Sequence, residues 1–241
     1  MTARPDGRTT EALRPIEIEL GVQNAPAGSV LIKWGGTHVL CSASIENRVP
    51  SFRLDSGGGW LTAEYAMLPG STSDRIRRDR RGIGGRTAEI QRLIGRSLRA
   101  GFDLKRLGEH TITIDCDVVN ADGGTRCAAI TGSYIAAILA LRHIAKKDLV
   151  ALICPPPVAA VSVGIHQGQI VTDLCYIEDS AADVDLNFVA SPRGIIEVQG
   201  TAEGDPFERS LFDALIDAGH AGCQTLFEMQ REALAKAGIE L

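Results

Sequence analysis

Thr111-Ile-Thr-Ile-Asp-Cys-Asp-Val-Val-Asn-Ala-Asp-Gly-Gly-Thr-Arg126 is the stretch of sequence that decides the fold. Apolar residues alternate from 111 to 119, which predicts a half-buried strand. Residues 120–124 predict a turn, and the small-residue run from Thr125 to Leu141 predicts a helix. A helix that begins after two glycines presents free N–H groups and the positive end of its dipole, so this turn is a candidate anion site. Arg126 adds a guanidinium suited to phosphate. The alternative is an ordinary strand-to-helix turn capped by Thr125.

The composition is that of a globular protein with a sizeable core. The chain has 241 residues, of which 44% are hydrophobic, enough for one large domain or two small ones. We expect a cytoplasmic protein, because no run of about 18 apolar residues is present and the N-terminus has no apolar signal core. The six cysteines form no C-x-x-C pair and the histidines are scattered, which argues against a zinc site or a disulfide framework.

Charge is distributed unevenly along the chain. The net charge of −5 argues against a general nucleic-acid binder, yet residues 75–106 contain ten Arg and one Lys against three acidic residues. Such a local excess is typical of a surface that binds a polyanion, although a solvated helix face is the alternative. The candidate RNA-binding residues are Arg75, Arg77, Arg78, Arg80, Arg81, Arg92 and Arg96.

The order of elements predicts an α+β fold with a duplicated unit. Both halves place strands before helices, and Pro155-Pro-Pro157 marks a break between them. We therefore expect an N-terminal half at 1–150 and a C-terminal half at 151–241, packed as one compact domain. Predicted strands are 16–20, 28–34, 37–45, 59–67, 111–119, 158–165, 169–174 and 195–200, with a further strand at the end of 176–189. Predicted helices are 87–100 and 125–141, with terminal helices in 207–237 broken near Gly219–Gly222.

Two features complete a candidate phosphoryl-transfer site. Arg86 precedes the predicted helix at 87–100, so a second helix N-terminus carries an arginine. Farther along, Asp179 and Asp185 belong to an acidic cluster that either holds a hard cation or lies on a solvated strand edge. An anion cradle, a divalent-cation site and a basic track are what phosphoryl transfer on a nucleic acid requires. Free inorganic phosphate fits as the nucleophile, because it needs positioning and charge neutralisation more than a strong base.

Several long motifs resemble those of the ribonuclease PH family, the bacterial phosphorolytic enzymes that trim tRNA 3′ ends. The resemblance runs from about residue 4 to residue 220 and includes the opening stretch. The other matching segments are Arg4-Pro-Asp-Gly-Arg8, Leu13-Arg-Pro15, Tyr65-Ala-Met-Leu-Pro69, residues 85–100, Glu178-Asp-Ser-Ala-Ala-Asp-Val-Asp185 and Glu197-Val-Gln-Gly-Thr201.

The resemblance implies a specific assignment of roles. Arg86 matches a phosphate-contacting arginine, and Gly124, Thr125 and Arg126 match the segment that holds phosphate. Asp179 and Asp185 match acidic residues needed for catalysis through Mg²⁺, although Asp185 acting as a proton donor stays an alternative. The arginines of 75–81 match a loop that handles tRNA. The implied fold is a twice-repeated βαβα unit, and the implied assembly is a homohexamer, a trimer of dimers.

Two other functions are compatible with parts of this pattern. A catalytically silent, exosome-like ring subunit would bind RNA, but we expect it to lack Arg86, Arg126 or Asp185, and this chain has all three. A phosphate-binding metabolic enzyme would leave the positive charge of residues 75–106 unexplained. Together with these residues, the resemblance implies a phosphorolytic 3′-to-5′ exoribonuclease that acts on tRNA precursors and releases nucleoside diphosphates.

Overall fold

The first half of the chain forms a five-stranded sheet with two long helices. The computed structural model describes residues 4–78, 82–144 and 156–240. Its first sheet has the strand order β1-β2-β3-β5-β4, with β4 parallel to β5 and every other pair antiparallel. Helix α1 makes the crossover that two parallel strands require. The elements are β1 (Ile16–Leu20), β2 (Gly28–Trp34), β3 (Thr37–Glu46), η1 (Ser51–Arg53), β4 (Trp60–Met67), α1 (Gly85–Gly101), β5 (Thr111–Asn120) and α2 (Thr125–Leu141).

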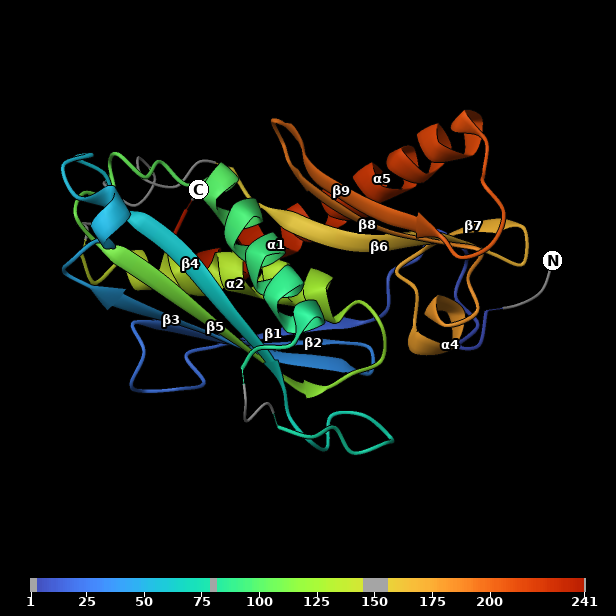
Figure 1. Ribbon diagram of the computed structural model, residues 1–241, viewed down its shortest axis with the longest axis horizontal. Coiled ribbons are helices and arrows are strands. Elements are labelled where there is room, and N and C mark those ends of the chain that lie inside the picture. Colours follow the sequence, from blue (N-terminus) through green and yellow to red (C-terminus); the bar gives the residue numbers. More distant parts are fainter. Residues whose placement is uncertain (1–3, 79–81, 145–155, 241) are drawn as a thin grey trace.

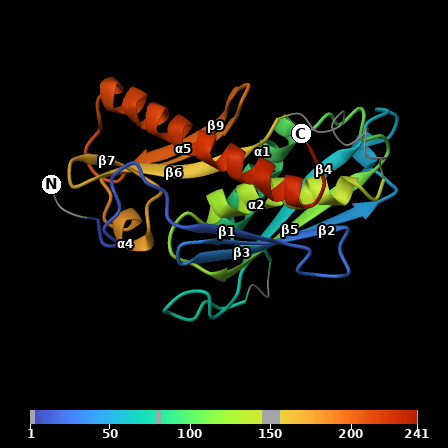
Figure 2. The same cartoon turned by 180° about the vertical axis from the view of Figure 1, so that it is seen from behind.

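The second half forms a four-stranded antiparallel sheet. Its strand order is β7-β6-β8-β9. A short helix, α4, separates β7 from β8, and the long helix α5 crosses the face of this sheet and reaches α2 (Figure 2). The elements are β6 (Ala159–His166), β7 (Gln169–Thr172), α4 (Tyr176–Asp179), β8 (Val184–Ser191), β9 (Gly194–Ala202) and α5 (Arg209–Lys236).

Helix α2 lies between the two sheets and connects their cores (Figure 1). Nearly all of its residues are buried, and many are Ala, Gly, Ser or Thr. Small side chains allow the strands to approach closely: a Cβ placed on Gly132 would lie 3.0 Å from atoms of Ile32 and Cys41. One hydrophobic cluster therefore extends from Val30 in the first sheet to Phe188 in the second. Burial of this apolar area stabilises both halves together.

The predicted fold class is confirmed, and the opening stretch folds as expected. Helix α2 has the predicted bounds, and β5 extends one residue beyond the predicted strand. The Gly35-Gly36 hairpin joins β2 to β3, with Gly35 at a φ of 54°. Helix α1 begins at Gly85, two residues before the prediction, because Gly84 serves as its N-cap. Arg86 consequently lies inside the first turn of α1. Pro155 of the predicted break lies outside the described residues.

The prediction of a break in the C-terminal helical region is wrong. Residues Arg209–Lys236 form one continuous helix. The glycines that suggested a break serve packing instead: a Cβ on Gly219 would lie 2.6 Å from the ring of Phe188, and one on Gly222 would lie 3.2 Å from Val161. Because glycine lets the helix backbone touch the sheet, the contact offsets the low helix propensity of glycine. Among the described residues, no helix is both long and apolar enough to cross a membrane.

Candidate active site

The turn between β5 and α2 is built on two glycines in the left-handed region. Gly123 has a φ of 75° and Gly124, the N-cap of α2, has a φ of 63°. No side chain caps α2, so the N–H groups of its first turn can bind an anion. The alternative in which Thr125 caps the helix is wrong, because Thr125 is its first residue. Its hydroxyl instead accepts a hydrogen bond of 2.9 Å from the Tyr65 hydroxyl.

Two side chains from the first half hold the turn. The Thr37 hydroxyl donates to the Gly123 carbonyl at 2.6 Å and accepts from the Asp122 N–H at 2.9 Å. The Arg14 guanidinium donates to the Asp122 carbonyl and, at 3.5 Å, to the Gly123 carbonyl. In a trans peptide the N–H points away from the preceding carbonyl. The amides of Gly123 and Gly124 therefore face the side opposite Arg14.

The structure brings Arg86 and Arg126 to the same place. Arg86 is in the first turn of α1 and Arg126 in the first turn of α2, and Arg126 lies 3.5 Å from Glu89, three residues after Arg86 on α1. Burial raises the pKa of Tyr65, of Asp179 and of Asp185, and the positive charges of Arg86 and Arg126 act against that rise at all three groups. The two predicted phosphate ligands therefore form one positively charged site that faces the acidic residues.

The acidic cluster divides into groups with different roles. Asp179 is the last residue of α4, and Asp185 is the second residue of β8. Burial raises the pKa of Asp179, whereas Arg126 and Arg86 lower it. Glu178, by contrast, is fully buried and pairs with Arg4 through bonds of 2.7 and 2.8 Å, and Asp183 is exposed. Within this cluster, Asp179 and Asp185 are thus the acids on which the charges of Arg86 and Arg126 act.

Asp185 has the environment expected of a cation ligand. Burial, and then the negative charge of Asp179, raises its pKa to about 6. Its Oδ1 atom is buried and has no hydrogen-bond partner among the described residues. Across those residues, no group of three or more His, Cys, Asp or Glu side chains could hold a metal. Mg²⁺ takes few protein carboxylates and retains water and substrate phosphate oxygens, so the Asp179–Asp185 pair fits this ion.

The predicted RNA-binding arginines that the structure describes lie in the loop before α1 and on α1 itself. Arg75, Arg77 and Arg78 are exposed, and Arg80 and Arg81 lie outside the described residues. On α1, Arg92 and Arg96 are exposed and line a cavity of about 240 Å³ with Gly85 and Glu89. Arg96 also forms an ion pair with Glu197 of β9. The cavity beside Arg92 and Arg96 reaches Gly85, which precedes Arg86 in the first turn of α1.

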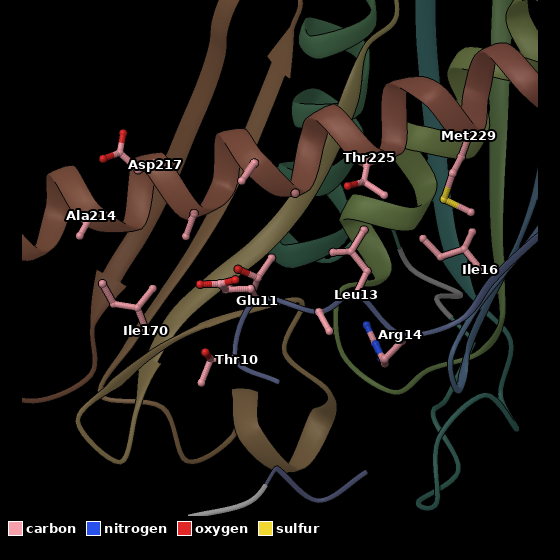
Figure 3. A pocket seen from close by; sticks show the side chains of 15 residues that line it. Thr10, Glu11, Leu13, Arg14, Ile16, Ile170, Ala214, Asp217, Thr225 and Met229 are labelled. Carbon is pink, nitrogen blue, oxygen red and sulfur yellow. The ribbon is translucent and has the colours of Figure 1, made fainter. Parts of the chain in front are cut away.

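The sequence did not predict the residues that hold the turn between β5 and α2 in place. The turn at residues 120–124, between β5 and α2, is here called the phosphate turn. It is held by residues that are distant in sequence, namely Arg14, Thr37 and, through Arg14, Asp173. Only Arg14 gave a signal, as part of the Leu13-Arg-Pro15 segment. A separate groove of about 760 Å³ between the N-terminal segment and α5 contains none of the predicted site residues (Figure 3). The candidate site is therefore defined by its charged groups rather than by a deep pocket.

Comparison with known proteins identifies the family. Residues 12–146 match the model of the 3′ exoribonuclease family, domain 1, and residues 156–222 match that of domain 2. Ribonuclease PH from Rhodococcus erythropolis is 53% identical over 98% of this chain and 92% of its own length. Ribonuclease PH from Saccharopolyspora erythraea is also 53% identical, over 97% of this chain and 95% of its own length.

Two solved structures share the fold at low sequence identity. The crystal structure of rice Rrp46 superimposes with a TM-score of 0.78 at 18% identity, over 96% of this chain and all of that one. The Archaeoglobus fulgidus exosome with RNA bound to the active site gives a TM-score of 0.77 at 21% identity, over 94% of this chain and 92% of that one. Because both family models and the relatives agree over nearly the whole sequence, the chain belongs to the ribonuclease PH family of 3′ exoribonucleases.

Proposed function

We propose that the chain trims extra nucleotides from tRNA precursor 3′ ends by phosphorolysis, with inorganic phosphate held between Arg86 and the Gly124–Thr125–Arg126 turn. The observation that carries the proposal is the convergence of two helix N-termini, each with an arginine, on Asp179 and Asp185. Such an arrangement binds a free phosphate and a phosphodiester next to each other, which is what an attack of one on the other needs.

The reaction exchanges one P–O bond for another. An oxygen of the bound phosphate attacks the terminal phosphodiester in line, the bond to the upstream 3′-oxygen breaks, and that oxygen takes up a proton. The products are a nucleoside diphosphate and an RNA shortened by one nucleotide. Arg86 and Arg126 hold the nucleophile and offset the negative charge that accumulates as the two phosphates meet. Bond exchange of this kind is nearly balanced in free energy, so nucleoside diphosphates also serve the reverse reaction.

Asp179 and Asp185 would hold Mg²⁺, which supplies charge neutralisation at the scissile phosphate and the leaving 3′-oxygen. The buried, unpartnered Oδ1 atom of Asp185 supports this assignment. A second role for Asp185 is proton donation to the leaving oxygen, which its pKa of about 6 supports. These two roles differ in their dependence on magnesium, and the experiment below measures that dependence.

The RNA reaches the site along the arginine surface. Arg75, Arg77 and Arg78 are exposed before α1, and Arg92 and Arg96 continue the positive charge along the helix. With Arg80 and Arg81, they contact the phosphate backbone of the tRNA.

We also propose that the protein assembles as a homohexamer, a trimer of dimers, and that it acts in the cytoplasm. The chain divides into its two halves near residue 150. The fold shared with the Archaeoglobus fulgidus exosome supports an assembly of several subunits.

The decisive experiment incubates tRNA carrying extra 3′ nucleotides with the protein, with and without inorganic phosphate, at several magnesium concentrations. We expect nucleoside diphosphates only when phosphate is present. Arg126→Ala should raise the phosphate requirement, and Asp185→Asn should slow turnover while RNA binding is retained. Monophosphate products, or release without phosphate, would indicate hydrolysis instead. RNA binding without any product would favour the silent ring subunit.

A further inference from the structure

We propose that Arg14 and Asp173 act as a positioning pair that holds the phosphate turn in register with the acidic pair. The inference rests on the proposed function, because it concerns how the two halves of that site are kept at a fixed separation. Neither residue is one of the proposed ligands of phosphate or of Mg²⁺. Their role is to connect the β5–α2 turn of the first half with the chain that leads into α4 of the second half.

Arg14 forms the bridge. Its side chain is only 4% exposed, and its guanidinium contacts both halves at once. Toward the second half, Nη2 donates to Asp173 Oδ1 at 2.7 Å and Nε donates to the same carboxylate at 3.1 Å. Toward the first half, Nη1 donates to the Asp122 carbonyl and Nη2 lies 3.5 Å from the Gly123 carbonyl. The planar, five-donor geometry of arginine permits this double contact, which lysine cannot reproduce.

Asp173 is a fixed anchor. It is 1% exposed and also accepts hydrogen bonds from the Arg14 backbone N–H at 2.6 Å and from the Trp34 indole at 2.9 Å. Its φ of 58° lies in the left-handed region, which is costly for a residue with a side chain. A buried carboxylate is stable only when donors compensate it, and here they come from β2 and from the N-terminal segment. The position of Asp173 is therefore fixed from several directions.

The turn also touches the start of α4 directly. The Tyr176 N–H donates to Asp122 Oδ1 at 3.2 Å, and a Cβ on Gly123 would lie 2.6 Å from the Leu174 carbonyl oxygen. Tyr176 begins the helix that ends at Asp179. A shift of the turn relative to Asp173 would therefore move the bound phosphate relative to the acidic pair.

Arg14 fixes the orientation of the turn. Because the carbonyls of Asp122 and Gly123 point to its guanidinium, the N–H groups that follow them point away from it. In-line attack depends on the separation of the two reacting phosphates, and misplacement by about 1 Å can cost roughly a hundredfold in rate. A rigid connection between the turn and α4 is what keeps that separation constant.

The test compares Arg14→Lys with Arg4→Lys. Arg4 belongs to the same N-terminal segment, is 7% exposed and pairs with buried Glu178. It also donates to the Asp173 carbonyl at 2.8 Å, so it shares the contact with the second half but forms no hydrogen bond with the turn among the described residues. We expect Arg14→Lys to raise the phosphate KM roughly tenfold or more and to lower kcat, with tRNA affinity changed less than about twofold. Arg4→Lys should lower thermal stability to a similar degree and leave the phosphate KM within about twofold.

Two further measurements separate positioning from stability. Thr37→Val loosens the turn without touching the second half, so it should raise the phosphate KM but leave the magnesium dependence unchanged, whereas Arg14→Lys should alter both. Calorimetric titration with inorganic phosphate measures binding without turnover. If Arg14→Lys does not fold, Asp173→Asn provides the same test with an unchanged side-chain shape. An unchanged phosphate KM and phosphate affinity in the folded variant would overturn the inference, whereas absence of phosphate-dependent diphosphates from the unmodified protein would overturn the proposed function.

Discussion

The guanidinium of Arg126 lies 3.5 Å from the carboxylate of Glu89, which is one turn beyond Arg86 on α1. A proposed phosphate ligand is therefore already paired with a carboxylate. The negative charge of Glu89 would oppose the binding of phosphate at the proposed site, between the first turns of the two helices.

From this pairing we expect Glu89→Gln to lower the phosphate KM by about two- to fivefold at low ionic strength. Removal of a partly exposed negative charge near the anion contributes about 1 kcal/mol or less. Glutamine keeps a side-chain oxygen that can accept from Arg126, so the arginine stays in place. The measurement is initial rate against phosphate concentration at low and high salt. A higher KM would mean that Glu89 mainly orients Arg126.

The raised pKa of Asp185 predicts that the ionised carboxylate lowers the stability of the fold, although the proposed reaction needs this residue. Burial and Asp179 raise this pKa to about 6, above the unfolded value of about 3.9. The folded state therefore binds the Asp185 proton more tightly than the unfolded state does. The contribution of this proton to the free energy of unfolding is complete below about pH 4 and is lost as the pH rises through 6. At pH 7.5 the ionised Asp185 lowers the free energy of unfolding by up to about 3 kcal/mol relative to the protonated form.

We accordingly expect Asp185→Asn to raise the melting temperature at pH 7.5 more than at pH 5, while it slows phosphorolysis. Magnesium should reduce the difference at pH 7.5, because it stabilises only the protein that retains the carboxylate. Thermal denaturation at both pH values, with chelator and with magnesium, measures this. The same increase at both pH values would contradict the raised pKa.

The salt dependence of RNA binding should reveal the arginine surface. Simultaneous substitution of Arg75, Arg77 and Arg78 by alanine should weaken tRNA binding and reduce the slope of log K against log salt by about 2 for single-stranded contacts. The phosphate KM with a short RNA substrate should stay the same. Arg209→Ala, at an exposed arginine on α5, serves as the control and should leave the slope unchanged. An unaltered slope in the triple variant would place RNA on another surface.

The continuous helix α5 predicts the effect of Gly219→Ala. Alanine favours a helix by about 1 kcal/mol, but its Cβ would lie 2.6 Å from the Phe188 ring. Overpacking of this kind costs about 1–3 kcal/mol, so we expect a net loss of stability. Gly222→Ala, whose nearest contact would be 3.2 Å, should lose less. Urea denaturation of both variants measures the difference. A more stable Gly219→Ala variant would mean that Phe188 moves to make room for the added methyl group.

Local patterns predicted most of the fold. Alternation of apolar residues located the strands, and the Gly35-Gly36 pair located a hairpin, since both signals depend on neighbours in sequence. The same signals failed in α5, because the glycines at 219 and 222 respond to Phe188 and Val161 on a different element. A close backbone contact and a helix break look alike in a sequence.

The family and its class of activity were predicted from long motifs, and the relatives confirm both. The roles assigned to Arg86, Arg126, Asp179 and Asp185 stay predictions, although the structure brings these residues together. The contacts of the supporting residues could not be predicted. Arg14 and Asp173 are 159 positions apart, and no periodicity relates them. Glu178 belongs to the same motif as Asp179, and only its ion pair with Arg4 separates its role from that of its neighbour.

The contact of Arg14 with Asp173 also sets an order of events during synthesis of the protein. Arg14 and the phosphate turn leave the ribosome early, but Asp173 follows α2 by more than thirty residues and Asp185 comes later still. A nascent chain that has reached only α2 lacks both the anchor of the turn and the acidic pair. A chain of that length therefore lacks part of the proposed site, and we expect it to leave RNA next to the ribosome intact.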